Sequence, residues 1–359
     1  MNKELLLVGS IPLPTAEKVI TTFGPPLGRY LYSMPDGEIG ARRWWVVRLS
    51  FQVFNNHPDM EVLKRPTRDG DVERITPRNR SDMWTFKVRD GVEQVRFGDP
   101  GTRLGFAFDA INSYFVFKTL RDQGLLPPEV RFQVSIPLVN SVIRKSTFTV
   151  EGDLERVRPG YEEALKAEMQ NIISNIPNQD LAIQFDCSHE VTDVNGGIPG
   201  EPMEGAIERN IGQIKRLSSI IPQTVSLGLH LCFGTFGGWP RFAPATLAPT
   251  VAFANAAIHA AGRRLDWVNI PTLDITEDSF FAPLADLNYR ETRVFLGAIH
   301  NNPTLEARLK VAQKYLPKFG LSAYCGFGRL EPDAMAGIIE DHKLAVTIGR
   351  KIGIFDQIN

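Results

Sequence analysis

Long hydrophobic runs, paired cysteines and an excess of charge of either sign are all missing from this chain of 359 residues. The N-terminal stretch "MNKELLLVGSIPLP" has an apolar run of only LLLV before Gly9 and Pro12, which is too short for the core of a signal peptide or for a membrane span. Three cysteines, an odd number spread far apart, do not make a disulfide framework. We therefore expect a cytoplasmic protein whose thiols are reduced and available for chemistry.

The charge of the chain is nearly balanced, with 40 lysines and arginines against 41 acidic residues. The basic residues are scattered along the sequence, so neither nucleic acid nor an anionic membrane surface is expected as a partner. A hydrophobic fraction of 43% is that of an ordinary soluble globular protein. No internal repeat, low-complexity tract or linker-like stretch divides the sequence, and we expect one domain over residues 1–359.

Eight short β-rich apolar runs alternate with longer segments of helical periodicity, the pattern of βα units and a parallel sheet. The runs are LLLVGS (5–10), RYLYSM (29–34), VRFQVSIP (130–137), LAIQFD (181–186), VSLGLHL (225–231), LDWVNI (265–270), RVFLGAI (293–299) and GLSAYC (320–325). Helices are expected within 153–176, 201–220, 246–264, 304–320 and 333–353. Eight alternations in one chain of this size predict an α/β fold, a (β/α)8 TIM barrel.

The connection between the second and third runs is too long for one βα unit. Residues 43 to about 110 are therefore predicted to be an insertion that caps one face of the barrel. Within this insertion, "TFKVRDGVEQVRF" (85–97) has Asp90-Gly91 between two alternating runs, which predicts a β-hairpin.

Polar residues that could catalyse a reaction, bind a substrate or bind a metal follow the predicted strands. They lie at the carboxyl ends, where TIM barrels have their active sites. All three cysteines and three of the six histidines fall there. The candidates, in chain order, are Ser10, Glu38, Asp186, Cys187, His230, Cys232, Asp274, Glu277, His300 and Cys325.

The pair His230 and Cys232, in "LHLCFG", lies two residues apart, so both side chains point to one face of the strand. Cys325 follows another strand and can supply a third ligand at the barrel mouth. A Cys₂His set favours zinc, and three protein ligands leave one position open, as in a catalytic site. The alternative is packing, because His-x-Cys alone is a weak signal and free cysteines are commonly buried.

The order of these segments resembles the catalytic barrel of cobalamin-independent methionine synthase, within the superfamily that includes uroporphyrinogen decarboxylase. The resembling segments are "LLLVGSIP", "DGEIGAR", "IQFDCSHE", "LHLCFG", "AIHNNP" and "YCGFGR". They run through most of the chain outside the insertion. Each is short, and their common order and spacing carry the resemblance.

The resemblance implies roles for the residues at the matching positions. Ser10, Glu38 and Asp186 would hold the amino-acid part of a thiol substrate, with Glu38 and Asp186 also counted as catalytic. His300 would be a proton donor or relay. Cys187 stands where the family has an acidic residue after the aspartate, and it is grouped with the substrate-binding residues.

The resemblance also implies that the His-x-Cys pair and the third cysteine bind zinc as the cofactor. One family ligand is missing, because the metal-binding glutamate of the family corresponds to Pro271 here. Asp274, Glu277, water or the substrate would then complete the coordination.

These inferences predict a zinc-dependent alkyl- or methyltransferase that activates a thiol substrate as a zinc thiolate. Its partners would be a small-molecule thiol and an alkyl donor, with a folate among the candidate donors. One alternative is a lyase, decarboxylase or hydrolase that uses the metal without a thiol acceptor, and another is a non-catalytic binding protein. The sequence leaves the identity of the thiol and the oligomeric state open.

Overall fold

The computed structural model describes residues 3–99, 101–289, 291–300 and 302–355. In this part of the chain eight parallel strands form a nearly closed barrel, which confirms the predicted (β/α)8 fold. The strands are β1 (Leu5–Leu6), β2 (Ser33–Pro35), β5 (Arg131–Pro137), β6 (Leu181–Cys187), β7 (Ser226–Leu231), β8 (Trp267–Pro271), β9 (Arg293–Gly297) and β10 (Gly320–Ser322). Each coincides with one of the eight predicted runs, although β2, β6 and β8 end one residue beyond theirs.

The strands follow one another round the barrel in the order β1-β10-β9-β8-β7-β6-β5-β2. The first and last strands of this order meet at an isolated parallel bridge between Leu5 and Leu31, beside which the amide of Tyr32 donates to the carbonyl of Leu5 at 3.0 Å. The carboxyl ends of all eight strands therefore open at one mouth.

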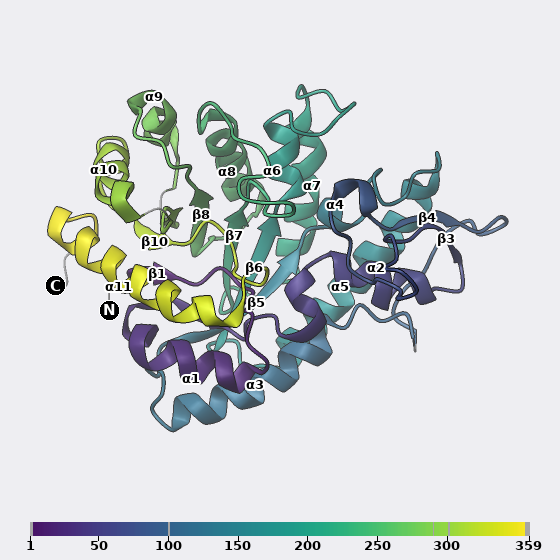
Figure 1. Ribbon diagram of the computed structural model, residues 1–359, viewed down its shortest axis with the longest axis horizontal. Coiled ribbons are helices and arrows are strands. Elements are labelled where there is room, and N and C mark those ends of the chain that lie inside the picture. Colours follow the sequence, from purple (N-terminus) through teal and green to yellow (C-terminus); the bar gives the residue numbers. More distant parts are fainter. Residues whose placement is uncertain (1–2, 100, 290, 301, 356–359) are drawn as a thin grey trace.

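Helices surround the strands (Figure 1). They are α1 (Ala16–Leu27), α2 (Val47–Gln52), α3 (Phe106–Asp122), α4 (Val139–Val142), α5 (Asp153–Asn175), α6 (His189–Val194), α7 (Ala206–Ser218), α8 (Ala248–Ala260), α9 (Asp278–Phe281), α10 (Asn302–Gln313) and α11 (Met335–Ile352). The five predicted helical segments contain α5, α7, α8, most of α10, and α11, which ends at Gly353 with a φ of 75°. In the described residues we find no helix with the length and apolar character needed to cross a membrane.

The barrel interior is filled by an aromatic layer with a polar layer nearer the mouth. Trp267 is fully buried and lies against Gly228, where a Cβ atom would come within 2.0 Å of the indole ring. Above it lie the buried polar side chains of Gln133, Gln184 and Asn269. Gln133 and Gln184 donate across the barrel to the carbonyls of Leu7 and Val8, which follow β1, and Asn269 donates to the Phe295 carbonyl on the neighbouring β9. The polar layer therefore connects strands on opposite sides of the barrel.

Residues 36–105, between β2 and α3, form an inserted segment beside α5 (Figure 1). It contains α2 and a two-stranded antiparallel sheet of β3 (Met60–Lys64) and β4 (Thr85–Val88). The predicted hairpin over 85–97 is wrong, since β4 pairs with β3 and the chain after Asp90-Gly91 forms no strand. The physical reason is tertiary: Val95 is fully buried, and its amide donates to the carbonyl of Arg156 at 2.9 Å.

The inserted segment ends earlier than the predicted boundary near residue 110. Helix α3 begins at Phe106, because the Glu168 carboxylate on α5 accepts hydrogen bonds from the amides of Gly105 at 2.9 Å and Ala107 at 2.6 Å. A carboxylate at this position satisfies amides that have no partner within the helix and matches the helix dipole. This cap comes from a distant helix, so the local sequence does not reveal it.

Candidate metal centre and its pocket

Three potential metal ligands meet at the carboxyl ends of β7 and β10. His230 lies in β7, Cys232 directly follows it, and Cys325 lies in the loop after β10. The three ligand atoms all lie within 4.8 Å of one another, and the two sulfur atoms are 3.5 Å apart. The cluster that the sequence predicted is therefore assembled in the structure.

The imidazole of His230 is oriented by the neighbouring strand. His230 and Asn269 are paired in register on β7 and β8, and Nδ1 of His230 lies 2.6 Å from Oδ1 of Asn269. The amide nitrogen of Asn269 donates to Ser322 Oγ and to the Phe295 carbonyl, so its oxygen is the acceptor for the His230 N–H. The other ring nitrogen, Nε2, is therefore left with a free lone pair on the side of the thiols.

The residues fit a tetrahedral metal ion. Nε2 of His230 is buried and has no hydrogen-bond partner among the described residues, a costly state that a metal ion would relieve. For Zn–S bonds of about 2.3 Å, tetrahedral geometry places two sulfurs about 3.8 Å apart, close to the separation found here. Two sulfurs and one imidazole nitrogen are the ligands that zinc prefers.

The two cysteines differ in their environments. The hydrogen bond from Cys232 lowers the pKa of Cys325 well below its usual value. Burial alone would raise this pKa, and the neighbouring His230 lowers it further. The same hydrogen bond, together with burial, raises the pKa of Cys232, whose sulfur also accepts the amide of Gly234 at 3.2 Å. One thiolate is thus already favoured at this position before any ion is considered.

A pocket of about 300 Å³ opens over the three ligands. Ser10, Glu38 and Asp186 line it together with the ligands. Ser10 accepts a hydrogen bond from the amide of Gly328 at 3.3 Å and lies against the loop that carries Cys325. The structure therefore brings three of the predicted substrate-binding residues to the metal ligands.

Glu38 and Asp186 form an acidic pair in this pocket. Burial and the neighbouring Asp186 raise the pKa of Glu38 well above its usual value, and burial raises the pKa of Asp186 to about 7. Both carboxyl groups therefore hold a proton to a higher pH than ordinary carboxyl groups do.

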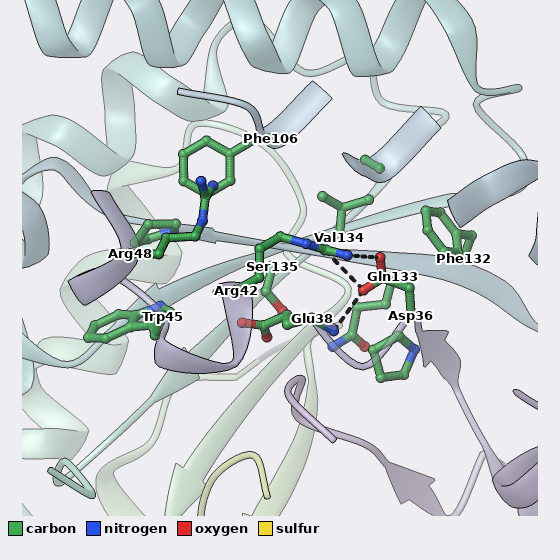
Figure 2. Close-up of a pocket in the computed structure, with 13 residues that line it drawn as sticks. Asp36, Glu38, Arg42, Trp45, Arg48, Phe106, Phe132, Gln133, Val134 and Ser135 are labelled. Atoms are coloured by element: carbon green, nitrogen blue, oxygen red, sulfur yellow. Dashed lines mark hydrogen bonds and ion pairs between the residues drawn. The ribbon is translucent and has the colours of Figure 1, made fainter. Parts of the chain in front are cut away.

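The turn after β2 holds Glu38 in place. Asp36 forms an ion pair with Arg42, with contacts of 2.7 and 3.2 Å, and accepts the amide of Glu38 at 2.9 Å (Figure 2). Glu38 has a positive φ of 47°, and its carboxylate lies on the side away from this ion pair. It packs over Gly9, where a Cβ atom would approach its carboxylate oxygen to 2.3 Å, so the glycine makes room for the acid.

Two predicted site residues are not brought to the pocket. Cys187 is fully buried in the hydrophobic core, on the opposite face of β6 from Asp186, and its Sγ lies 3.8 Å from the Phe185 carbonyl. His300 is held by the Thr272 carbonyl at 2.8 Å, and burial with the nearby Arg308 lowers its pKa to about 4.

The two candidates for a fourth ligand also lie elsewhere. Asp274 contacts Thr304 and Arg308 on α10, and Glu277 is exposed just before α9. Among the described residues, the ligand cluster holds no acidic member. Nothing from the protein therefore occupies the fourth corner in this part of the chain.

Five arginines line this pocket: Arg43, Arg80, Arg144, Arg241 and Arg329. Three of them, Arg80, Arg144 and Arg241, were not expected there from the sequence. Arg80 comes from the inserted segment, Arg144 from the loop after α4, and Arg241 from the loop after β7. They are far apart in the sequence, where basic residues look scattered, and no local pattern reveals that the fold gathers them.

Comparison with known proteins shows the fold. No family model and no curated protein matches the sequence. A B12-independent methionine synthase from Shewanella sp. W3-18-1, solved in complex with selenomethionine, superposes with a TM-score of 0.62 at 14% identity over 98% of both chains. A candidate vitamin-B12 independent methionine synthase from Listeria monocytogenes superposes with a TM-score of 0.54 at 16% identity, over 93% of this chain and 86% of that one. The chain therefore has a methionine synthase-like barrel.

Proposed function

On this methionine synthase-like barrel, we propose that the chain is a zinc-dependent alkyl- or methyltransferase acting on a thiol. The observation that carries the proposal is the unpartnered Nε2 of His230, buried beside two cysteine sulfurs at the floor of a pocket. Such a set has three protein donors and one open corner, which is the arrangement of a catalytic zinc site.

A bound zinc ion would lower the pKa of a thiol ligand, so that the thiol is a nucleophile at neutral pH. The protein residues bind and orient the reactants around that position. In this proposal Glu38 and Asp186 would accept hydrogen bonds from an ammonium group of the substrate, and Ser10 lines the same pocket. Positioning of this kind supplies much of the acceleration in a group transfer between two bound molecules.

The substrate is therefore proposed to be a thiol that also carries an amino group. The Shewanella protein of the same fold was solved with selenomethionine, an alkylated selenium amino acid, which agrees with this chemistry. In this proposal the thiol proton would leave through the acidic pair, since burial raises the pKa of the Asp186 carboxyl to about 7.

Zinc content tests the proposal directly. Wild type should contain about one zinc per chain, as expected for a three-ligand site, and Cys325→Ser and Cys232→Ala should lose it. Cys187→Ala is the matched control, because it removes a buried thiol outside the pocket. Mass spectrometry of the purified proteins gives the metal content, and circular dichroism checks that each variant is folded.

Cobalt-substituted protein gives a second measurement. Addition of a thiol substrate should strengthen the sulfur-to-cobalt charge-transfer absorption, because a further sulfur joins the metal. Zinc retained in both cysteine variants, or a thiol that reacts equally well in metal-free wild type, would falsify the proposal.

A second candidate function follows from the same acidic pair. With the fourth corner open and Asp186 titrating near pH 7, the site also suits a lyase, decarboxylase or hydrolase that binds a substrate oxygen. Turnover that needs zinc but no thiol acceptor would favour this function over alkyl transfer.

A further inference from the structure

The outer wall of the pocket carries an unusual concentration of positive charge. Arg80, Arg144 and Arg241 all line the same cavity as the metal ligands, and they come from three separate loops. Burial, together with the positive charges of Arg80 and Arg144, lowers the pKa of Arg241 to about 10. The three guanidinium groups are therefore near enough to repel one another. Three like charges held together repel one another unless an anion binds among them.

These arginines lack the carboxylate partners that other arginines of the chain have. Arg42 and Arg216 each form two hydrogen bonds to one carboxylate. By contrast, no carboxylate of the described residues lies within salt-bridge distance of Arg80, Arg144 or Arg241. The positive charge of the wall is therefore not neutralised by the part of the protein that the structure describes.

The remaining contacts of the three side chains leave most of their donors available. Arg144 makes one side-chain hydrogen bond, from Nε to Thr147 Oγ1 at 3.4 Å. Nε of Arg241 is buried and has no partner among the described residues. Glu190 is the acidic residue that interacts electrostatically with Arg144. Its carboxylate accepts a hydrogen bond from Ser141, and burial raises its pKa to about 7. Glu190 therefore carries less negative charge near neutral pH than an ordinary glutamate.

The backbone places Arg241 beside the metal ligands. The Cβ and Cδ atoms of Arg241 lie 2.9 Å from where a Cβ of Gly234 would be, so only glycine lets the arginine stem cross the chain there. Gly234 also has a positive φ of 79° and donates its amide to the sulfur of Cys232. The loop after β7 thus carries both Cys232 and Arg241. We call Arg80, Arg144 and Arg241 together the arginine wall.

We propose that Arg80, Arg144 and Arg241 form a subsite for a doubly charged, phosphate-class oxyanion carried by one of the two substrates. Guanidinium groups bind such oxyanions through paired N–H donors, and several of them together favour two negative charges over one. The assignment of this oxyanion to a substrate rests on the proposed transferase function, whereas anion binding by the three arginines does not.

Titration calorimetry of the purified holoprotein with inorganic phosphate tests the subsite. Methanesulfonate and acetate, at matched ionic strength, distinguish a phosphorylated substrate from a sulfonated or carboxylated one. We expect saturable binding of phosphate that is stronger than that of either singly charged anion. Loss of one charged hydrogen-bonding partner weakens such binding by about tenfold to a hundredfold, so this loss is expected for Arg80→Gln and Arg241→Gln.

The matched control is Arg103→Gln, which removes an exposed arginine of the same inserted segment outside the pocket. Because Arg80 is itself exposed, Arg80→Gln should fold normally, and it keeps the test valid if Arg241→Gln does not fold. Phosphate binding that is equal in wild type and Arg80→Gln, or equal binding of acetate and phosphate, overturns the proposal.

Two further measurements separate this proposal from the metal proposal. Phosphate binding that survives zinc removal by a chelator but is lost in Arg80→Gln supports the arginine subsite. Phosphate binding that disappears with the zinc and is unchanged in the arginine variants shows that phosphate binds the metal, and the subsite is then wrong. A protein that purifies without zinc but binds phosphate through these arginines refutes the transferase proposal alone.

Discussion

Asn269 should control the metal affinity of the site although it does not belong to the ligand set. Its Oδ1 accepts the Nδ1–H of His230 at 2.6 Å, and this bond presents Nε2 toward the two sulfurs. Replacing Asn269 with alanine leaves the imidazole free to rotate and to exchange its proton between nitrogens. Loss of such a partner to a ligating histidine costs about tenfold to a hundredfold in metal affinity, or roughly 1.4 to 2.8 kcal/mol.

The same change also affects folding, because Asn269 is fully buried and bonds to Ser322 and to the Phe295 carbonyl. Leaving such buried groups without partners costs about 1 to 3 kcal/mol of stability. The two effects are separated by Ser322→Ala, which removes one bond of the network but keeps the bond to His230. We expect Ser322→Ala to be less stable and to bind zinc as wild type does.

Competition with a chromophoric chelator measures zinc affinity, and urea unfolding of the metal-free proteins measures stability. Asn269→Asp retains an acceptor for Nδ1 and should bind zinc more tightly than Asn269→Ala. The reasoning is refuted if Asn269→Ala binds zinc as tightly as wild type, or if its loss of affinity equals that of Ser322→Ala.

Two other predictions concern the fold around the site. Burial raises the pKa of the Glu190 carboxyl from the ordinary 4.5 to about 7 in the folded protein, so the unfolded chain releases its proton first as pH rises. About 3 kcal/mol of stability should therefore be lost between those pH values. Urea unfolding should show a decrease in Glu190→Gln that is smaller than in wild type by about this amount, since the contribution of Asp186 remains, and parallel pH profiles would contradict it. Gly228→Ala should give no folded protein, because the new methyl group would overlap the ring of Trp267, whereas Gly337→Ala, in an open part of α11, should gain about 0.5 to 1 kcal/mol. Soluble yield and thermal unfolding measure both, and a cooperative, wild-type transition for Gly228→Ala would show that the barrel interior can rearrange.

The cluster of His230, Cys232 and Cys325 could be predicted from the sequence because the placement of these residues depends on simple geometry. Residues two apart on a strand share a face, which places His230 beside Cys232. The carboxyl ends of parallel strands meet at one mouth, which brings Cys325 to the same cluster. The prediction needed no knowledge of side-chain packing, and the structure confirms the cluster.

Residues whose position depends on distant packing could not be predicted in this way. His300 follows a strand as expected, but Arg308 on α10 contacts both its ring and its carbonyl and holds it outside the pocket. The chain after Asp90 has the alternation of a strand, yet Val95 is buried against α5 rather than paired with β4. In both cases a partner far along the chain outweighs the local pattern.

The pocket carries opposite charges in two places, and this has a consequence for binding. Glu38 and Asp186 line the pocket together with His230, Cys232 and Cys325, and Arg80, Arg144 and Arg241 line it from three other segments. A substrate with one charge of each sign would therefore be expected to bind in one orientation, with its cationic group near the acidic pair. Because Arg80 is exposed while Asp186 is buried, added salt should weaken the anionic end of this interaction more than the cationic end. Since the inserted segment contributes both Arg80 and Glu38, we expect it to orient the substrate over the carboxyl ends of the barrel strands.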